Sequence, residues 1–347
     1  MTPADALSRA TEVSEKILFP AAMSVDAADR IPAAHLDALA SAGLYGLAGP
    51  AAAGALSTAD STLASVIEIM ASGCLATTFV WLQHHSAVRA LAATQNAGLR
   101  DQWMDQLCLG AQRAGIALGG ARPGPPLLRA RVVPRGYVFD GSAPWVTGWD
   151  MIDVILTLAR DEAGNVVAAL LPAQVGSSLA ATSLPLVAVN ASRTVELTFL
   201  SHFVPAELVT SVTPHREWLA RDTRGLRNNG SLSLGVARRC CRLLAALADH
   251  DNQVAAAAPA LAGDLVTRRK ALDESDAEAM PAARAAASAF AFQVAGLLVA
   301  AAGSHAIVTS EHPQRLARES LFLLVFGSRP AIKDQLTAML IARGSGN

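Results

Sequence analysis

The feature that most constrains the fold of this chain is a double change in its hydrophobic periodicity. Up to about residue 115, and again beyond about residue 213, apolar residues recur at the spacing of amphipathic helices. Between these regions, short apolar runs alternate with turn residues such as Pro134-Arg135-Gly136, a pattern typical of strands and hairpins. The order of helices, strands and helices indicates separate packed layers rather than the alternating βαβ units of a Rossmann fold.

We therefore predict an α+β protein with three domains. Residues 1–117 are expected to form an N-terminal helical domain, residues 118–212 a middle β-barrel or sandwich domain, and residues 213–347 a C-terminal four-helix bundle. The spacing of Thr2, Pro3 and Asp5 is that of a capping box with proline at the first helical position, which predicts a helix from Pro3. A further helix is predicted from an apolar stripe made of Leu63, Val66, Ile67 and Met70.

Composition narrows the class of protein. Hydrophobic residues make up 52% of the chain and charged residues 16%, and alanine and leucine, both strong helix formers, dominate the apolar set. The longest apolar stretch, 285–303, is interrupted by polar residues and is expected to be a buried bundle helix rather than a membrane span. The net charge of −1 provides no positive field, so we expect neither nucleic acid nor a membrane surface as a partner.

The four cysteines also limit the options. Cys74, Cys108, Cys240 and Cys241 have neither metal-ligand spacing nor the density of a disulfide scaffold. The first residues lack the basic and apolar regions of a secretory signal. We therefore expect no metal site and a cytoplasmic location.

Several stretches along nearly the whole chain resemble the acyl-CoA dehydrogenases. The most specific is Gly136-Tyr137-Val138-Phe139-Asp140-Gly141 followed by Trp145-Val146-Thr147-Gly148, which is similar to the family's "GY-LNG-K-WITN" hairpin. A helical turn near the start of this chain looks like the family's "AGL-GL" turn. The family's last strand with its "VP" exit, its "GG-GY" turn and its "GT" pair also have counterparts in this sequence. These matching stretches are 31–47, 194–207, 302–303, 312–319 and 327–328.

The resemblance implies a flavoprotein that binds FAD. Trp145 would cover the flavin ring and Thr147 would hydrogen-bond its polar rim, while the alternatives are an ordinary core aromatic and an ordinary strand residue. The other cofactor-binding residues implied by the matching motifs are Gly148, Gly303, Gly327 and Ser328.

The sequence departs from the family where a base is needed. A glutamate usually precedes the "GT" pair and removes the substrate's α-proton, but here Phe326 occupies that position, so it is expected to line the substrate site instead. Some members carry the glutamate on the first bundle helix, where Thr223 is found here. Asp222 beside it is a weak substitute, with a solvated charge paired to Arg221 or Arg224 as the alternative.

Two cofactor motifs are also altered. The loop that would correspond to "TEP-GSD" is rich in proline and glycine, and Arg122 is its one charged residue and a candidate substrate contact. The "R-FG" motif that reaches the FAD diphosphate from a neighbouring subunit is missing, because residues 248–266 contain no arginine. Arg268, Arg269 or a partner chain would have to supply the cations that a diphosphate requires.

Two further groups have more than one interpretation. His84 and His85 are adjacent, so they do not form a zinc face. Because related flavin monooxygenases use histidine near the flavin, either is a weak catalytic candidate, and a buried core or interface histidine is the alternative. Arg238-Arg239 and Arg242 are compatible with a coenzyme A phosphate site and equally with a solvated or subunit-facing stripe.

The leading hypothesis is an FAD-dependent oxidoreductase of this fold that acts on an acyl thioester or a similar small organic substrate. One alternative is a flavin-dependent monooxygenase, which has no need for the α-proton base. Another is a non-catalytic subunit that pairs with an active paralogue. The alanine-rich bundle helices are expected to form a homodimer or homotetramer.

Overall fold

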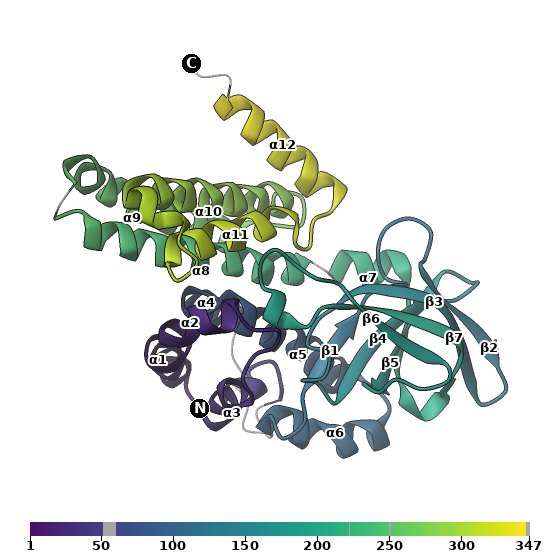
Figure 1. Ribbon diagram of the computed structural model, residues 1–347. Coiled ribbons are helices and arrows are strands. Elements are labelled where there is room, and N and C mark those ends of the chain that lie inside the picture. The colour runs from purple at the N-terminus through teal and green to yellow at the C-terminus, as the bar shows by residue number, and fades with distance from the viewer. Residues whose placement is uncertain (51–59, 222, 250, 345–347) are drawn as a thin grey trace.

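The computed structural model describes residues 1–50, 60–221, 223–249 and 251–344. Figure 1 shows three parts: helices at the N-terminus, a sheet domain beside them, and a bundle of helices that lies along the N-terminal helices. The predicted fold class, with a helical domain, a middle β domain and a C-terminal helical bundle, is confirmed.

The N-terminal helices form where the sequence predicted them. Thr2 caps the first helix, because its hydroxyl accepts from Asp5 N at 3.2 Å while the Asp5 carboxylate accepts from Thr2 N at 3.0 Å. The apolar stripe of the fourth helix is buried throughout, as predicted. The elements are α1 (Pro3–Val13), η1 (Ser14–Leu18), α2 (Phe19–Asp26), α3 (Ala33–Ser41), η2 (Leu44–Gly46), α4 (Asp60–Gly73), α5 (Leu75–Ala93) and α6 (Ala97–Leu109).

The middle domain is one sheet of eight strands in the order β6-β7-β3-β2-β4-β5-β8, with β1 added in parallel beside β4. β1 lies on the N-terminal side of the domain boundary predicted after residue 117. Phe139 of β3 and Phe199 of β7 lie at the centre of its apolar core. The strands are β1 (Ala114–Ala117), β2 (Leu128–Val133), β3 (Gly136–Val146), β4 (Val154–Arg160), β5 (Asn165–Pro172), β6 (Leu179–Ser183), β7 (Val195–Pro205) and β8 (Val209–Pro214).

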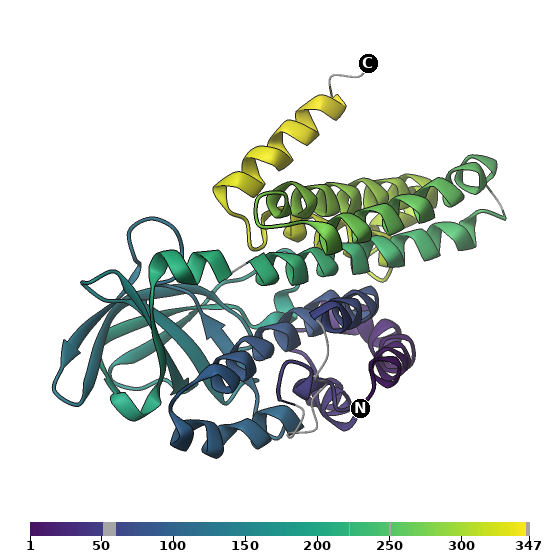
Figure 2. The ribbon, with the colours of Figure 1, turned by 180° about the vertical axis from the view of Figure 1, so that it is seen from behind.

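The C-terminal helices pack around α10, the alanine-rich helix. Met280–Ile307 is apolar and long enough to cross a membrane, but half of its most apolar window is buried inside the protein, as expected for a bundle helix. α12 extends away from the rest of the bundle (Figure 2). The elements are α7 (His215–Arg221), α8 (Thr223–Leu247), α9 (Asn252–Glu274), α10 (Met280–Ala302), η6 (Gly303–Ile307), α11 (His312–Val325) and α12 (Pro330–Gly344).

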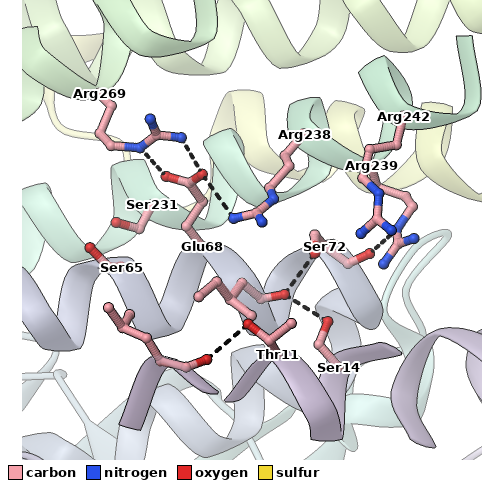
Figure 3. Close-up of polar contacts among 12 residues, drawn as sticks. Thr11, Ser14, Ser65, Glu68, Ser72, Ser231, Arg238, Arg239, Arg242 and Arg269 are labelled. Atoms are coloured by element: carbon pink, nitrogen blue, oxygen red, sulfur yellow. Dashed lines mark hydrogen bonds and ion pairs between the residues drawn. The ribbon is translucent and has the colours of Figure 1, made fainter. Parts of the chain in front are cut away.

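A buried carboxylate on α4 joins the N-terminal helices to the bundle. The Glu68 carboxylate, whose side chain is only 3% exposed, accepts from Arg269 Nε of α9 at 2.8 Å and from Arg269 Nη2 at 2.5 Å. Arg238 of α8 lies 3.7 Å from the same carboxylate. Figure 3 shows Glu68 between the two arginines. Arg269 is therefore already paired within the chain.

A second ion pair lies further along the same interface. Arg239 of α8 donates to Ser72 O at 2.5 Å (Figure 3). It also donates to the Glu15 carboxylate at 2.7 Å, and Arg242 donates to the same carboxylate at 2.5 Å. The sequence alone is compatible with a coenzyme A phosphate site at these arginines and equally with a solvated or subunit-facing stripe. In the structure, they neutralise carboxylates between two domains of this chain.

Candidate functional site

Trp145 lies at a β-bulge near the end of β3. Between Ala143 and Val146, β3 has one residue more than the facing part of β7, and Trp145 adopts a left-handed backbone with φ of +66°. Its side chain is 53% exposed, which is unusual for a tryptophan on a sheet. Bulges redirect side chains and are common next to active sites. Here the bulge turns an indole ring toward the surface.

The residues that follow the bulge form a buried chain of hydroxyl groups. Thr147 Oγ1 lies 3.3 Å from Thr194 Oγ1, which in turn lies 2.8 Å from Ser192 Oγ. All three side chains are buried. Gly148 N donates to Ser192 O at 2.8 Å. The turn after β3 is thereby bonded to residues 184–194, the segment that connects β6 with β7 and that we call the 184–194 segment.

Backbone strain is concentrated at this turn. Six described non-glycine residues have positive φ, and four of them lie here: Trp145 (+66°), Asp150 (+63°), Val189 (+53°) and Arg193 (+49°). Left-handed backbone is especially unfavourable for a β-branched residue such as Val189. Such strain persists only where surrounding contacts enforce it, and it clusters at functional sites. The strain marks the end of β3 as a candidate site without reference to any relative.

α5 connects the end of β3 with the end of α11. A Cβ added to Gly148 would lie 3.1 Å from Val80 Cγ1, so the turn packs directly on α5. The neighbouring residue, Phe79, makes edge contacts with the rings of Phe322 (5.1 Å between centroids) and Phe326 (4.9 Å) of α11 and its cap. In the structure, α5 therefore lies between the Thr147–Gly148 turn and Phe326.

Two of the glycines predicted to bind the cofactor, Gly303 and Gly327, do not lie together in the structure. Gly327 has a φ of +61°, and a side chain there would collide with Asn229 Nδ2 of α8 at 2.6 Å, so Gly327 and Ser328 form a tight turn beside Phe326. Gly303 lies at the C-terminal end of α10, whereas the turn at Gly327 lies beside the start of α10, next to Arg284. The cofactor role of Gly303 within this chain stays a prediction.

Arg284 of α10 donates hydrogen bonds to the C-terminal end of α11. Its fully buried guanidinium donates to Phe326 O at 3.3 Å, to Leu323 O at 3.4 Å and to the hydroxyls of Ser233 and Ser288, and it contacts no carboxylate among the described residues. Burial lowers its pKa to about 10, so it stays charged at neutral pH. The cation satisfies carbonyl groups at the negative end of the α11 dipole.

The loop of Arg122 is fixed by its backbone. Arg160 of β4 donates to the carbonyl oxygens of Gly120 (2.8 Å), Arg122 (2.5 Å) and Gly124 (2.8 Å). The Arg122 side chain is exposed. Burial lowers the pKa of Arg329, which follows Ser328, and the charge of Arg122 lowers this pKa further. Arg122 is thus close enough to the turn after α11 to affect its electrostatics.

His84 and His85 are buried on α5. His84 Nδ1 accepts from Ala114 N at 3.1 Å, and desolvation lowers the pKa of His84 to about 3. The His85 ring packs edge-on against Trp81 at 4.6 Å, and burial holds its pKa well below the usual value. Both rings are neutral at pH 7. The environments are those of core histidines, and within the described residues no group of three potential ligands is suited to a metal.

These histidines should make the protein sensitive to acid. Because their folded-state pKa values are depressed, the unfolded chain takes up protons first, and stability falls as pH drops below about 6.5. Each such histidine costs about 1.4 kcal/mol per pH unit until its folded-state pKa is reached. Removing one ionisable ring with His85→Leu should lower the slope of unfolding free energy against pH by about that amount, measured by denaturant titration between pH 5 and 7.5.

The matched control for this measurement is His305→Leu on η6. His305 is exposed, so its replacement should leave the slope unchanged. An unchanged slope in His85→Leu would mean that His85 takes up protons in the folded protein.

The two positions considered for a substitute base, Asp222 and Thr223, are only partly covered by the described residues. Asp222 lies outside the described residues. Thr223 begins α8, but its side chain is likewise outside the described part.

Residues 5–111 match a family model described as acyl-CoA dehydrogenase, N-terminal domain. The whole structure is similar to butyryl-CoA dehydrogenase from Megasphaera elsdenii, with a TM-score of 0.85 and 15% identity over 98% of both chains. The protein has the acyl-CoA dehydrogenase fold. The family resemblance that the sequence indicated is thereby confirmed.

The same fold is found in a monooxygenase. Dibenzothiophene monooxygenase (TdsC) from Paenibacillus sp. A11-2 matches with a TM-score of 0.80 and 18% identity over 97% of both chains. A second structure of TdsC, with FMN bound, gives a TM-score of 0.81, also at 18% identity and 97% coverage of both chains. A search of curated protein sequences gives no match. At these identities, the similarity establishes the fold but not the reaction.

Within this acyl-CoA dehydrogenase fold, Trp145 fits a flavin ring, whereas one of the predicted diphosphate anchors, Arg269, is already paired. Trp145 offers an exposed ring face next to the Thr147 turn, as a planar aromatic ligand requires. Arg269 is committed to Glu68, and Arg268 lies over the Phe290 ring at 5.6 Å. Because of its ion pair, Arg269 is not a ready partner for a diphosphate.

Sequence reasoning missed several residues of this site. Three of them lie on helices: Phe79, Phe322 and Asn229. The apolar pattern of a helix predicts which side chains are buried, but it does not predict which residues of other helices they contact. The sequence did contain a signal for Arg284, because it is the one charged residue of α10 (Met280–Ala302). A lone charge in an alanine-rich helix indicates a buried polar contact.

Proposed function

We propose that the protein is a flavin-dependent oxidoreductase that acts on an acyl thioester or a similar small organic substrate. The observation that carries the proposal is the turn after β3, where strained backbone presents the exposed Trp145 ring in the stretch that leads to Thr147. Strain of this kind is maintained where a ligand must be held in a defined geometry. The acyl-CoA dehydrogenase fold supports the choice of a flavin as the ligand.

The residues of this chain would bind and orient rather than transfer protons. Trp145 would cover the flavin ring, and the buried hydroxyl chain from Thr147 to Ser192 would hold the turn that carries it. Phe326, Phe322 and Phe79 would form a dry wall for an apolar substrate. When bound, the flavin supplies the redox chemistry.

A second candidate function is flavin-dependent monooxygenation. The observation that favours it is the ion pair of Arg269 with Glu68, which removes one of the cations predicted to bind a diphosphate. A flavin with a single phosphate needs fewer cations, and the TdsC structure with FMN shows that this fold accommodates one. Phe326 in place of a carboxylate fits a reaction that has no need for an α-proton base.

We also propose that the active assembly is a homodimer or homotetramer. Large apolar side chains face outward on the bundle, including Val266 of α9 (58% exposed) and Phe292 of α10 (41% exposed). Outward apolar residues on neighbouring helices are typical of surfaces that meet another subunit. A second copy would also provide a source for the missing diphosphate cations.

The experiment that tests the flavin proposal is a titration of purified protein with FAD and with FMN, followed by flavin fluorescence. Trp145→Ala should weaken the binding of the preferred flavin about tenfold or more, because stacking and burial of an aromatic pair contribute about 0.5–1.5 kcal/mol beyond the lost apolar area. Thr147→Ala should weaken binding as well. Preference for FMN over FAD would favour the monooxygenase.

Tyr137→Ala is the matched control for the titration. Tyr137 is a half-buried aromatic at the opposite end of β3, paired with Val204. Its replacement should leave flavin affinity unchanged. If Trp145→Ala and Thr147→Ala both bind flavin as tightly as the wild type, the proposed placement is wrong. If the wild-type protein binds no flavin, the hypothesis of a non-catalytic subunit becomes the better one.

A further inference from the structure

Arg318 of α11 bonds to all three domains. Its guanidinium donates to both carboxylate oxygens of Asp26 at the end of α2, with the Nη1–Oδ1 distance at 3.1 Å. The same Nη1 donates to Val187 O of the 184–194 segment at 2.9 Å, and Nε donates to Gln314 Oε1 at 3.0 Å. One side chain thus joins the bundle, the N-terminal helices and the β domain.

The bond to Val187 falls on strained backbone. Val189, two residues later, is 2% exposed and left-handed at a φ of +53°, and Arg193 is left-handed at +49°. Val189 and Ala191 pack into the core formed by the helical domains, although the segment belongs to the β domain. The conformation of the segment is therefore enforced by its contacts with the helices, because nothing local favours a left-handed valine.

The strained segment in turn fixes the turn after β3. Gly148 N donates to Ser192 O at 2.8 Å and Trp149 N donates to Arg193 O at 3.2 Å. Arg193 also donates to the Asp150 carboxylate at 2.5 Å. Both amides lie directly beyond Thr147, so a shift of the segment moves the backbone that carries the predicted flavin contacts.

We propose that Arg318 is a positioning residue that sets the geometry of the turn after β3, residues 145–149, through the 184–194 segment. Its link to Asp26 and Val187 fixes the segment against the helices, and the segment fixes the turn. The effect on flavin binding rests on the proposed function, whereas the effect on the turn itself does not. The consequence is that the site has its binding geometry only when the three domains are docked.

The test compares Arg318→Met with Arg242→Met by hydrogen exchange and mass spectrometry on ligand-free protein. Arg242 also joins the bundle to an N-terminal carboxylate, Glu15, but this ion pair does not involve the β domain. In Arg318→Met, peptides that cover 147–150 and 184–194 should exchange about tenfold faster or more, because a charge-assisted link to the segment is lost. In Arg242→Met, the exchange of these peptides should match the wild type.

The same variants are then titrated with FAD and FMN. Arg318→Met should raise the dissociation constant about tenfold, and Arg242→Met should leave it unchanged. If Arg318→Met does not fold, Asp26→Asn and Arg318→Lys replace it, since each keeps the side-chain size while weakening the three-way link. Arg318→Lys should restore part of the protection, because it keeps the charge next to Asp26.

The outcomes separate the two proposals. Faster exchange at both segments, in a protein that binds no flavin in any variant, would support the positioning role and defeat the proposed function. Faster exchange at 184–194 alone, with 147–150 unchanged, would overturn the positioning role. Equal acceleration across all three domains in Arg318→Met and Arg242→Met would also overturn it, because the role would then be general stability.

Discussion

Replacing Phe326 with glutamate is expected to raise acyl-CoA dehydrogenation about 10²–10⁴-fold over the wild type, the contribution typical of a general base. Phe326 occupies the position where the resemblance implies the base, and its ring stacks on Phe322 at 5.3 Å and meets Phe79 at 4.9 Å. A carboxyl group among these rings would be desolvated, which raises its pKa toward the working pH. The assay uses short, medium and long acyl-CoAs with added FAD and an artificial electron acceptor.

Two controls make the result specific. Phe322→Glu places a carboxylate in the same aromatic cluster one turn earlier on α11, and it should give no gain. Asp222→Asn tests the weak substitute base predicted from the sequence. Strong wild-type turnover that survives Asp222→Asn would show that the base lies elsewhere, and equal activity in both glutamate variants would show that position 326 is not special.

The second large effect is expected from the buried ion pair on α11. Arg315 Nη1 donates to Glu319 Oε1 at 2.6 Å, and the two side chains are 1% and 4% exposed. Arg315→Met should lower the free energy of unfolding by about 3–5 kcal/mol, because it leaves a carboxylate buried without its cation. Denaturant titration by far-UV circular dichroism at pH 7 measures the loss.

The double variant Arg315→Met/Glu319→Leu should recover most of that loss, since an apolar replacement of both partners removes the buried charge. The deficit of the single variant should also shrink at lower pH. Burial raises the pKa of Glu319 in the folded state, so its protonation there relieves the penalty as pH falls. Lys16→Met, which breaks an exposed pair with Glu12, should leave stability unchanged. A single variant as stable as the wild type would mean that Glu319 is already neutral.

Local patterns predicted the elements well because each depends on neighbouring residues alone. The capping box at Thr2 and Asp5 is present as expected, and the predicted turn at Pro134-Arg135-Gly136 joins β2 to β3. The apolar stretch 285–303 forms a buried helix because its alanine side chains allow close packing on several neighbours. Helix formation and burial follow from periodicity, which the chain carries in its order of residues.

The candidate site was predicted only in part. The match at 136–148 identified Trp145 and Thr147, and the structure presents the first on a strained bulge and the second in a hydroxyl chain. Pattern reasoning gave no indication that Val189 and Arg193 support this turn. They are separated from it by about 40 residues, and the strain arises from packing against helices that are even more distant in the sequence, among them α2 and α5.

The arginines show the same limit. The sequence left Arg238, Arg239 and Arg242 open as a phosphate site or a solvated stripe, because charge alone does not reveal the partner. Docking of α8 against α4 and η1 decided the matter by placing Glu68 and Glu15 opposite them. A charge on a helix surface is satisfied by whichever element packs there.

By itself, the sequence determined the order of the elements, the fold class and the family resemblance, since all three depend on residue types at short, regular spacings. Tertiary structure alone decided the contents of the site: the position of Phe326 against Phe79, the neutral state of His84 and His85, and the three-domain link at Arg318. The physical reason is that burial, strain and charge pairing are set by contacts between residues far apart in the chain, and those contacts exist only once the domains have docked.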